Sequence, residues 1–252
     1  RKMRIEIGKV NISDCLEGLR EIGTESIDTI ITDPPYSSGA RREAGRTLRG
    51  QDKMTRGENR AEWFGCDSLT TKGLSYLMRE CALEWNRVLK DGGHALIFID
   101  WRMSATLSAV IESADLREDS IIVWDKTFFG MGSCFRNQHE FILHFTKGKG
   151  TPPLRRDVGN VIQCKPIRNG SHPTEKPVPL IEKLISVVTP PGGIILDCFA
   201  GTGATGVAAR NTGRKFIGIE REKGYADRAN GRLAEMRLEG VSLREEGPEN
   251  GT

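Results

Sequence analysis

The segment 193–220, GIILDCFAGTGATGVAARNTGRKFIGIE, limits the choice of fold more than any other part of the chain. An apolar run leads into a glycine-rich loop, a helical pattern follows, and a second apolar run ends at Glu220. Two such runs joined through a helix indicate parallel strands, because a parallel pair needs a crossover connection. The loop reads G-x-G-x-x-G at Gly201, Gly203 and Gly206, as in doubly wound sheets. We therefore expect a parallel α/β sheet.

The rest of the sequence repeats this alternation of apolar and helical patterns. Several apolar runs are continuous, which is typical of strands covered by helices on both faces. Seven such runs in 252 residues predict a doubly wound, mostly parallel, seven-stranded sheet. We expect one domain over residues 1–243 and a flexible tail at 244–252. The expected strands are 9–12, 27–32, 94–100, 120–125, 141–145, 193–199 and 215–220, and the expected helices are 74–93 (ended by Gly92 and Gly93), 177–188, 203–213 and 223–240.

Composition and cysteine spacing argue against several classes of protein. No apolar run approaches the roughly 20 residues of a membrane helix, and no signal peptide opens the chain. Six cysteines stand at positions 15, 66, 81, 134, 164 and 198 without a CxxC pair, which argues against a zinc site. We therefore expect a cytoplasmic protein with reduced thiols and no bound metal.

Positive charge is concentrated in two glycine-containing stretches, although the formal net charge is only +3. Residues 40–60 hold seven Arg and Lys against three acids, and residues 147–170 hold six against one. Two basic loops, at about 37–62 and 147–170, indicate that a polyanion is contacted at chosen places. Solvated loops without a partner are the alternative explanation.

The glycine loop leaves the type of cofactor open. Glu220 ends the next strand, 19 residues after Gly201, and can accept hydrogen bonds from a ribose diol. That spacing fits NAD or FAD, and it also fits S-adenosylmethionine, which has a ribose diol but no pyrophosphate. Asp197 at the tip of the first strand can hold the ammonium of S-adenosylmethionine and would repel a phosphate. A glycine turn that only packs a helix on the sheet is the third reading.

A second motif, DPPY at 33–36, narrows these choices through a resemblance. Together with DCFAGTGATG at 197–206, it resembles the DNA amino-methyltransferases, which methylate adenine N6 or cytosine N4. The order of motifs, with HPTEKPVPLIEKLI and the glycine loop last, resembles the β-class, a circular permutation of the class I methyltransferase sheet. Segments 85–98 and 123–148 also look like bacterial and phage members. A nicotinamide or flavin oxidoreductase would leave DPPY and both basic loops unexplained. A nucleic-acid-binding module with an inactive cofactor site would leave the presence of Asp33, Asp197 and Glu220 together unexplained.

The resemblance implies S-adenosylmethionine as cofactor and double-stranded DNA as partner, with adenine favoured by the DPPY form of the motif. It also allows a homodimer, and either a restriction partner or none. It implies that Asp14 and Phe199 lie near the cofactor's adenine, and that Thr174 and Lys176 lie near its methionine part. The full cofactor set is Asp14, Cys15, Thr174, Lys176, Asp197, Phe199, Gly201, Gly203 and Glu220, and the expected DNA contacts are Arg41, Arg42, Arg46, Arg49, Arg136, His139, Arg155 and Arg156.

The expected catalytic residues are Asp33, Pro34, Pro35 and Tyr36. A base amine is a poor nucleophile because its lone pair is delocalised into the ring. Asp33 and the Pro34 carbonyl can each accept a hydrogen bond from the amine and so localise that pair, while the carboxylate stabilises the positive charge that develops on nitrogen. Each proline fixes its own φ and restricts the preceding residue. Tyr36 offers a face on which a flipped base can stack.

Overall fold

The computed structural model describes residues 5–35, 71–130, 134–167 and 175–242. Within them a single sheet has the order β1-β8-β7-β2-β3-β5-β4-β6, and β5 alone runs antiparallel to its neighbours. The predicted doubly wound, mostly parallel α/β sheet is confirmed, but it has eight strands where seven were expected. The strands are β1 (Val10–Ile12), β2 (Ile27–Thr32), β3 (Leu89–Ile99), β4 (Leu116–Asp125), β5 (His139–Lys147), β6 (Val161–Gln163), β7 (Ile194–Asp197) and β8 (Lys215–Glu220).

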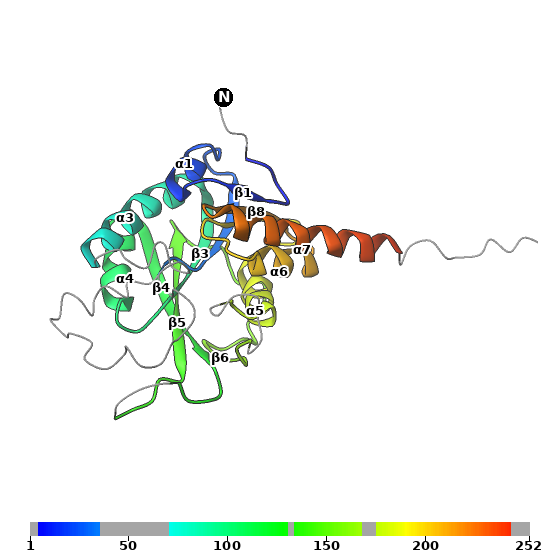
Figure 1. Cartoon of the computed structure of the whole chain (residues 1–252). Helices are drawn as coiled ribbons and strands as arrows, with labels where there is room; N and C mark the ends of the chain where they lie inside the picture. Colours follow the sequence, from blue (N-terminus) through cyan, green and yellow to red (C-terminus); the bar gives the residue numbers. More distant parts are fainter. Residues whose placement is uncertain (1–4, 36–70, 131–133, 168–174, 243–252) are drawn as a thin grey trace, which may run out of the picture.

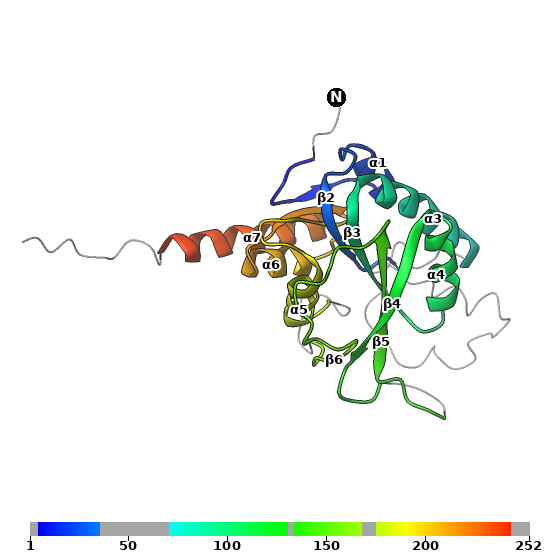
Figure 2. The ribbon, with the colours of Figure 1, turned by 180° about the vertical axis from the view of Figure 1, so that it is seen from behind.

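Helices cover both faces of the sheet, as Figures 1 and 2 show. Trp85 and Met78 are fully buried beneath one helical layer, and Phe216 and Ile185 are buried beneath the other. Each such side chain contributes roughly 1.5–3 kcal/mol by leaving water. The first layer is α1 (Cys15–Arg20), α3 (Thr71–Val88) and α4 (Ser104–Glu112), and the second is α5 (Val178–Val188), α6 (Ala204–Asn211) and α7 (Lys223–Ser242).

The glycine pair expected to end the first long helix has a different role. The helix α3 ends at Val88, and Gly92 and Gly93 lie inside β3, where the pairing with β2 shifts register. Gly92 has φ of +75°, and a Cβ on Gly93 would stand 2.9 Å from the carbonyl oxygen of Lys90. The glycines are therefore required by a bulge in the strand, and the helix ends without them.

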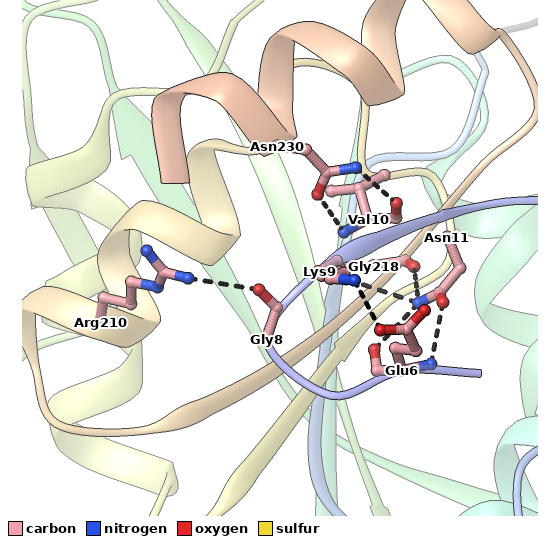
Figure 3. Close-up of polar contacts among 8 residues, drawn as sticks. All are labelled: Glu6, Gly8, Lys9, Val10, Asn11, Arg210, Gly218 and Asn230. Atoms are coloured by element: carbon pink, nitrogen blue, oxygen red, sulfur yellow. Dashed lines mark hydrogen bonds and ion pairs between the residues drawn. The ribbon is translucent and has the colours of Figure 1, made fainter. Parts of the chain in front are cut away.

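The first strand is held in place by residues from the other end of the chain (Figure 3). β1 is an edge strand and pairs in parallel with β8. On its open side, the Asn230 side chain of α7 accepts from the Val10 N–H and donates to the Val10 carbonyl, both at 2.9 Å. Asn11 Nδ2 donates to the Gly218 carbonyl at 3.0 Å. These contacts satisfy an exposed strand edge, and they match the circular permutation expected from the motif order.

Five acidic residues lie along one edge of the sheet, because β1, β8, β7, β2 and β3 run in the same direction. Open α/β sheets bind ligands outside the carboxyl ends of their strands, so this edge is where a site is expected. The residues at these strand ends are Asp14, Glu220, Asp197, Asp33 and Asp100.

Candidate active site

The glycine loop between β7 and α6 leaves room for a ligand. Gly203 caps α6 with φ of +81°, and a Cβ there would lie 2.8 Å from the Cβ of Ala229. Gly201 has φ of +50°, and a Cβ there would meet nothing within 4 Å. Gly203 is thus needed for packing against α7, whereas the space beside Gly201 is open for close approach of a cofactor.

Glu220 and Asp14 stand at the tips of the neighbouring strands. The Glu220 carboxylate accepts from the N–H of Gly201 at 2.9 Å and from the N–H of Glu222 at 2.8 Å. Because a carboxylate has about four acceptor positions, it retains capacity for a ribose diol. Asp14 is exposed and caps α1 through the N–H of Leu16 at 2.9 Å. These positions fit the ribose and adenine roles expected of Glu220 and Asp14.

Two expected cofactor residues lie differently. The Cys15 side chain is 6% exposed and its Sγ lies 3.9 Å from that of Cys81, so it belongs to the core. Only the main chain of Cys15 remains available to a ligand. Phe199 is partly buried against the same core layer, and its N–H donates to Asp197 Oδ1 at 3.1 Å.

Asp197 ties the glycine loop to the strand that carries the DPPY motif. Its Oδ1 accepts from Thr32 Oγ1 and its Oδ2 from Thr205 Oγ1, each at 2.7 Å, and the residue is 4% exposed. Burial raises the pKa of Asp197 to about 6, against the opposing effect of these hydrogen bonds. The Phe199 N–H is a third donor to this carboxylate, and these bonds tie β7 to β2 and α6; the ammonium contact expected of Asp197 stays a prediction.

Asp33 follows β2 and makes an ion pair that the sequence did not indicate. Lys176 Nζ donates to Asp33 Oδ2 at 2.6 Å and lies 3.5 Å from Glu140 Oε2. Lys126 in turn binds Glu140 Oε1 at 2.6 Å. Burial alone would lower the pKa of Lys176, but the charges of Asp33 and Glu140 outweigh it and the pKa is raised. Four charged groups therefore form one connected series of ion pairs: Asp33, Lys176, Glu140 and Lys126.

A pocket of about 340 Å³ borders this series of ion pairs. It lies where β3 and β4 end and β5 begins, and it shares Glu140 and Lys126 with the ion pairs. Trp101 is 54% exposed and Phe128 37% exposed, so both offer ring surface near the pocket. Its lining residues are Asp100, Trp101, Arg102, Lys126, Phe128, Gly130, Asn137, His139, Glu140 and Pro166.

The residues expected to contact DNA fall into two groups. His139 lines the pocket, and Arg136 lies in the connection leading to it, donating to the Gly130 carbonyl at 2.9 Å. Arg155 and Arg156 lie elsewhere: Leu154, just before them, donates to the carbonyl of Val187, at the end of α5 that leads into the start of β7. The structure thus does not bring Arg155 and Arg156 together with Asp33.

Pro34 is buried and Pro35 is half-buried in the segment after β2. Among the described residues no cluster of His, Cys, Asp and Glu could hold a metal ion, and no helix in these same ranges is long and apolar enough to cross a membrane. Several predictions lie outside the described residues: Tyr36, Arg41, Arg42, Arg46, Arg49 and Thr174, the loop at 37–62 and the tail at 244–252.

Comparison with known proteins agrees with this geometry. The family model described as DNA methylase matches residues 27–231. The Type II methyltransferase M.HinfI of Haemophilus influenzae is 31% identical over 254 residues, covering 89% of this chain and 67% of the relative. The crystal structure of the M1.HpyAVI-SAM complex superposes with a TM-score of 0.65 at 24% identity, covering 89% of this chain and 98% of that one.

The cytosine-N4-specific PvuII DNA methyltransferase has the same fold, with a TM-score of 0.68 at 17% identity over 95% of this chain and 94% of its own. The predicted methyltransferase fold is confirmed by these structural neighbours. The family match over most of the chain points to the same class of protein. S-adenosylmethionine is the cofactor and DNA the substrate. The chain belongs to the N6/N4 family of DNA methyltransferases.

Proposed function

We propose that this protein methylates the N6 amine of an adenine flipped out of double-stranded DNA, using a single catalytic domain over residues 1–243. The observation that carries the proposal is the contact between Thr32 and Asp197. It joins β2 to β7 at 2.7 Å, so that the acceptor motif and the glycine loop stand on the same edge of the sheet. A methyl group held beside the loop is then within reach of an amine held by Asp33.

Asp33 and the Pro34 carbonyl act as acceptors for the two hydrogens of the target amine. S-adenosylmethionine, when bound, supplies a methyl carbon that the amine nitrogen attacks while the C–S electron pair leaves on sulfur. Asp33 does not deprotonate the amine beforehand, because a carboxylate is far too weak a base for so weak an acid. Its negative charge instead stabilises the cationic nitrogen, which afterwards releases a proton to water.

The remaining site residues are proposed to position the two substrates. Glu220 accepts from the ribose diol, the open space beside Gly201 admits the cofactor, and Phe199 packs on its adenine. Thr174 and Lys176 face its methionine part. The role of Glu220 is supported by its spare acceptor capacity, and that of Gly201 by the open space beside it.

The pocket beside Glu140 is proposed to admit the flipped nucleotide. Its volume of about 340 Å³ is in the range of small-molecule sites, and Trp101 and Phe128 expose ring faces to it. Tyr36 is proposed to stack on the base, which returns roughly 1–3 kcal/mol of the cost of extrusion. Arg136 and His139 are proposed to contact DNA at the pocket, and the arginines of residues 37–62 are proposed to contact DNA as well.

Cytosine N4 is the second candidate acceptor, because one structural neighbour is a cytosine-N4-specific enzyme. Both amines need the same pair of acceptors, so the geometry of Asp33 and Pro34 serves either. The DPPY form of the motif favours adenine.

The deciding experiment is mass spectrometry of nucleosides after the protein has acted on duplex DNA with isotopically labelled S-adenosylmethionine. Labelled N6-methyladenine is expected, and labelled N4-methylcytosine in its place would overturn the choice of base. Asp33→Ala should abolish the label while calorimetry still detects cofactor binding. Near-normal turnover by that variant would refute the role given to Asp33.

A further inference from the structure

The Lys176 ammonium is shared between two carboxylates. It is 7% exposed, it lies 2.6 Å from Asp33 Oδ2 and 3.5 Å from Glu140 Oε2, and it stands 5.3 Å from the centre of the Phe98 ring. Asp33 follows β2, whereas Glu140 belongs to β5, so the lysine bridges two separate strands. Glu140 is fixed in turn by Lys126 at 2.6 Å.

This ion pair conflicts with the role proposed for Asp33. A carboxylate that accepts a hydrogen bond from the target amine must also stabilise positive charge growing on its nitrogen. An ammonium in direct contact with the same carboxylate neutralises it and repels the new charge. The arrangement with Lys176 bonded to Asp33 is therefore unfavourable for methyl transfer, and the lysine has to give up that contact.

Glu140 is a second anion that forms an ion pair with Lys176. A movement of about 0.7 Å would shorten the 3.5 Å separation to the length of an ordinary charge-assisted hydrogen bond. The ammonium would then remain paired throughout, which matters because an unpaired charge buried at this depth is strongly unfavourable.

We propose that Glu140 is a positioning residue for methyl transfer, which takes the Lys176 ammonium from Asp33 as the target amine arrives. The inference rests on the proposed role of Asp33 as acceptor. Both partners stay charged at neutral pH: burial alone would raise the pKa of Glu140, but Lys176 and Lys126 lower it. Lys126, 26% exposed at its side chain, keeps Glu140 in place during the exchange.

The test is a double-mutant cycle of Glu140→Gln and Lys176→Met. Single-turnover rates are measured on duplex DNA with cofactor at saturating concentration, so that any loss of cofactor affinity does not enter. E140Q should slow the rate at least about 10-fold, because the side chain at position 140 then carries no charge to draw Lys176 away from Asp33. The double variant should be at least several-fold faster than E140Q alone, because no ammonium remains to compete for Asp33.

A purely structural role for Glu140 predicts a different pattern, since a second loss in the same cluster would leave the rate as low or lower. A double variant no faster than E140Q, or an E140Q rate equal to that of the unmodified protein, overturns the inference. Glu140→Asp keeps the negative charge and should be faster than E140Q; equal rates for the two would also contradict the inference. Melting temperature and calorimetric cofactor affinity verify that each variant is folded.

The matched control is Glu25→Gln. Glu25 forms a Glu–Lys pair with Lys147 at 3.2 Å, is 59% exposed and lies before β2, away from the carboxyl edge. It should leave the single-turnover rate unchanged. The failure of the inference is separable from that of the proposed function, because the base identity and the Asp33→Ala result are obtained without Glu140 or Lys176 variants.

Discussion

Acidification should weaken the fold through a buried pair of histidines on β3 and β5. His94 is 4% exposed; its Nδ1 lies 3.0 Å from His144 Nε2, and its Nε2 lies 3.0 Å from Thr151 Oγ1. One proton fills the contact between the two neutral rings; a second would convert one ring into a cation and set two N–H donors against each other. Burial, followed by the nearby His144, lowers the pKa of His94 from 6.5 to about 4, while Asp119 opposes the shift.

The sign and size follow from proton linkage. The folded pKa lies below the unfolded value, so the contribution of His94 is complete above about pH 6.5 and is lost as the pH falls toward 4. Between pH 7 and pH 5 the loss is about 2 kcal/mol, out of a ceiling of roughly 3 kcal/mol. Asp197 acts in the opposite direction, because its raised pKa of about 6 makes protonation favourable to the folded state as the pH falls.

Comparison with a variant isolates the histidine from Asp197. His94→Gln keeps an amide that donates and accepts but does not titrate, and Asp197 is common to both proteins. Urea unfolding at pH 7 and pH 5 gives the free energy of unfolding of each. The unmodified protein should lose about 2 kcal/mol more than the variant over this interval. Equal losses in the two proteins would refute the reasoning.

Three further predictions concern DNA, the cofactor loop and the sheet edge. Arg136→Ala should weaken DNA binding and reduce the slope of log affinity against log salt by about 1, whereas Arg155→Ala, on a segment away from Asp33, should leave the slope unchanged in the same titration. Gly203→Ala should lower the free energy of unfolding by more than Gly213→Ala, because both have positive φ but only the first would meet a neighbouring side chain, and calorimetry should show weaker cofactor binding by the first alone. Asn230→Ala should cost about 1–2 kcal/mol in denaturant unfolding by exposing two groups of the edge strand; a change below 0.5 kcal/mol, the usual range for ordinary surface sites, would contradict the capping role.

Most of the sheet could be predicted because continuous apolar runs are unambiguous when helical patterns separate them. The misses have physical causes. β6 (Val161–Gln163) has three residues and α1 (Cys15–Arg20) has six, so neither shows enough hydrophobic periodicity to be recognised in the sequence. Gly92 lies near the end of a helical pattern, where glycine commonly terminates a helix, but its positive φ serves a strand bulge that depends on the neighbouring strand.

The places of the site motifs could be read from local patterns in the sequence, whereas the ion pairs and hydrogen bonds made by tertiary pairing could not. DPPY and the glycine loop each have a recognisable local pattern, and Thr32 and Asp197, which precede them, are hydrogen-bonded at one edge of the sheet. Glu140 stands in an apolar strand with no local signal beyond being a charge in that pattern, and its partner Lys176 is 36 residues away. Thr32 and Thr205, which lie on other elements, donate hydrogen bonds to Asp197, and their spacing in the sequence does not reveal these contacts.

The permuted order of the strands has a consequence for synthesis on the ribosome. The strand preceding Asp33 is translated before β7 and β8, which the cofactor site needs, and that site closes only when Gly218 pairs with Val10, about 200 residues earlier in the sequence. A nascent chain that stops before residue 220 therefore holds the acceptor without any means of binding the methyl donor. Contacts this distant in sequence also form slowly, so we expect methylating capacity to arise only after β8 has left the exit tunnel and paired with β1.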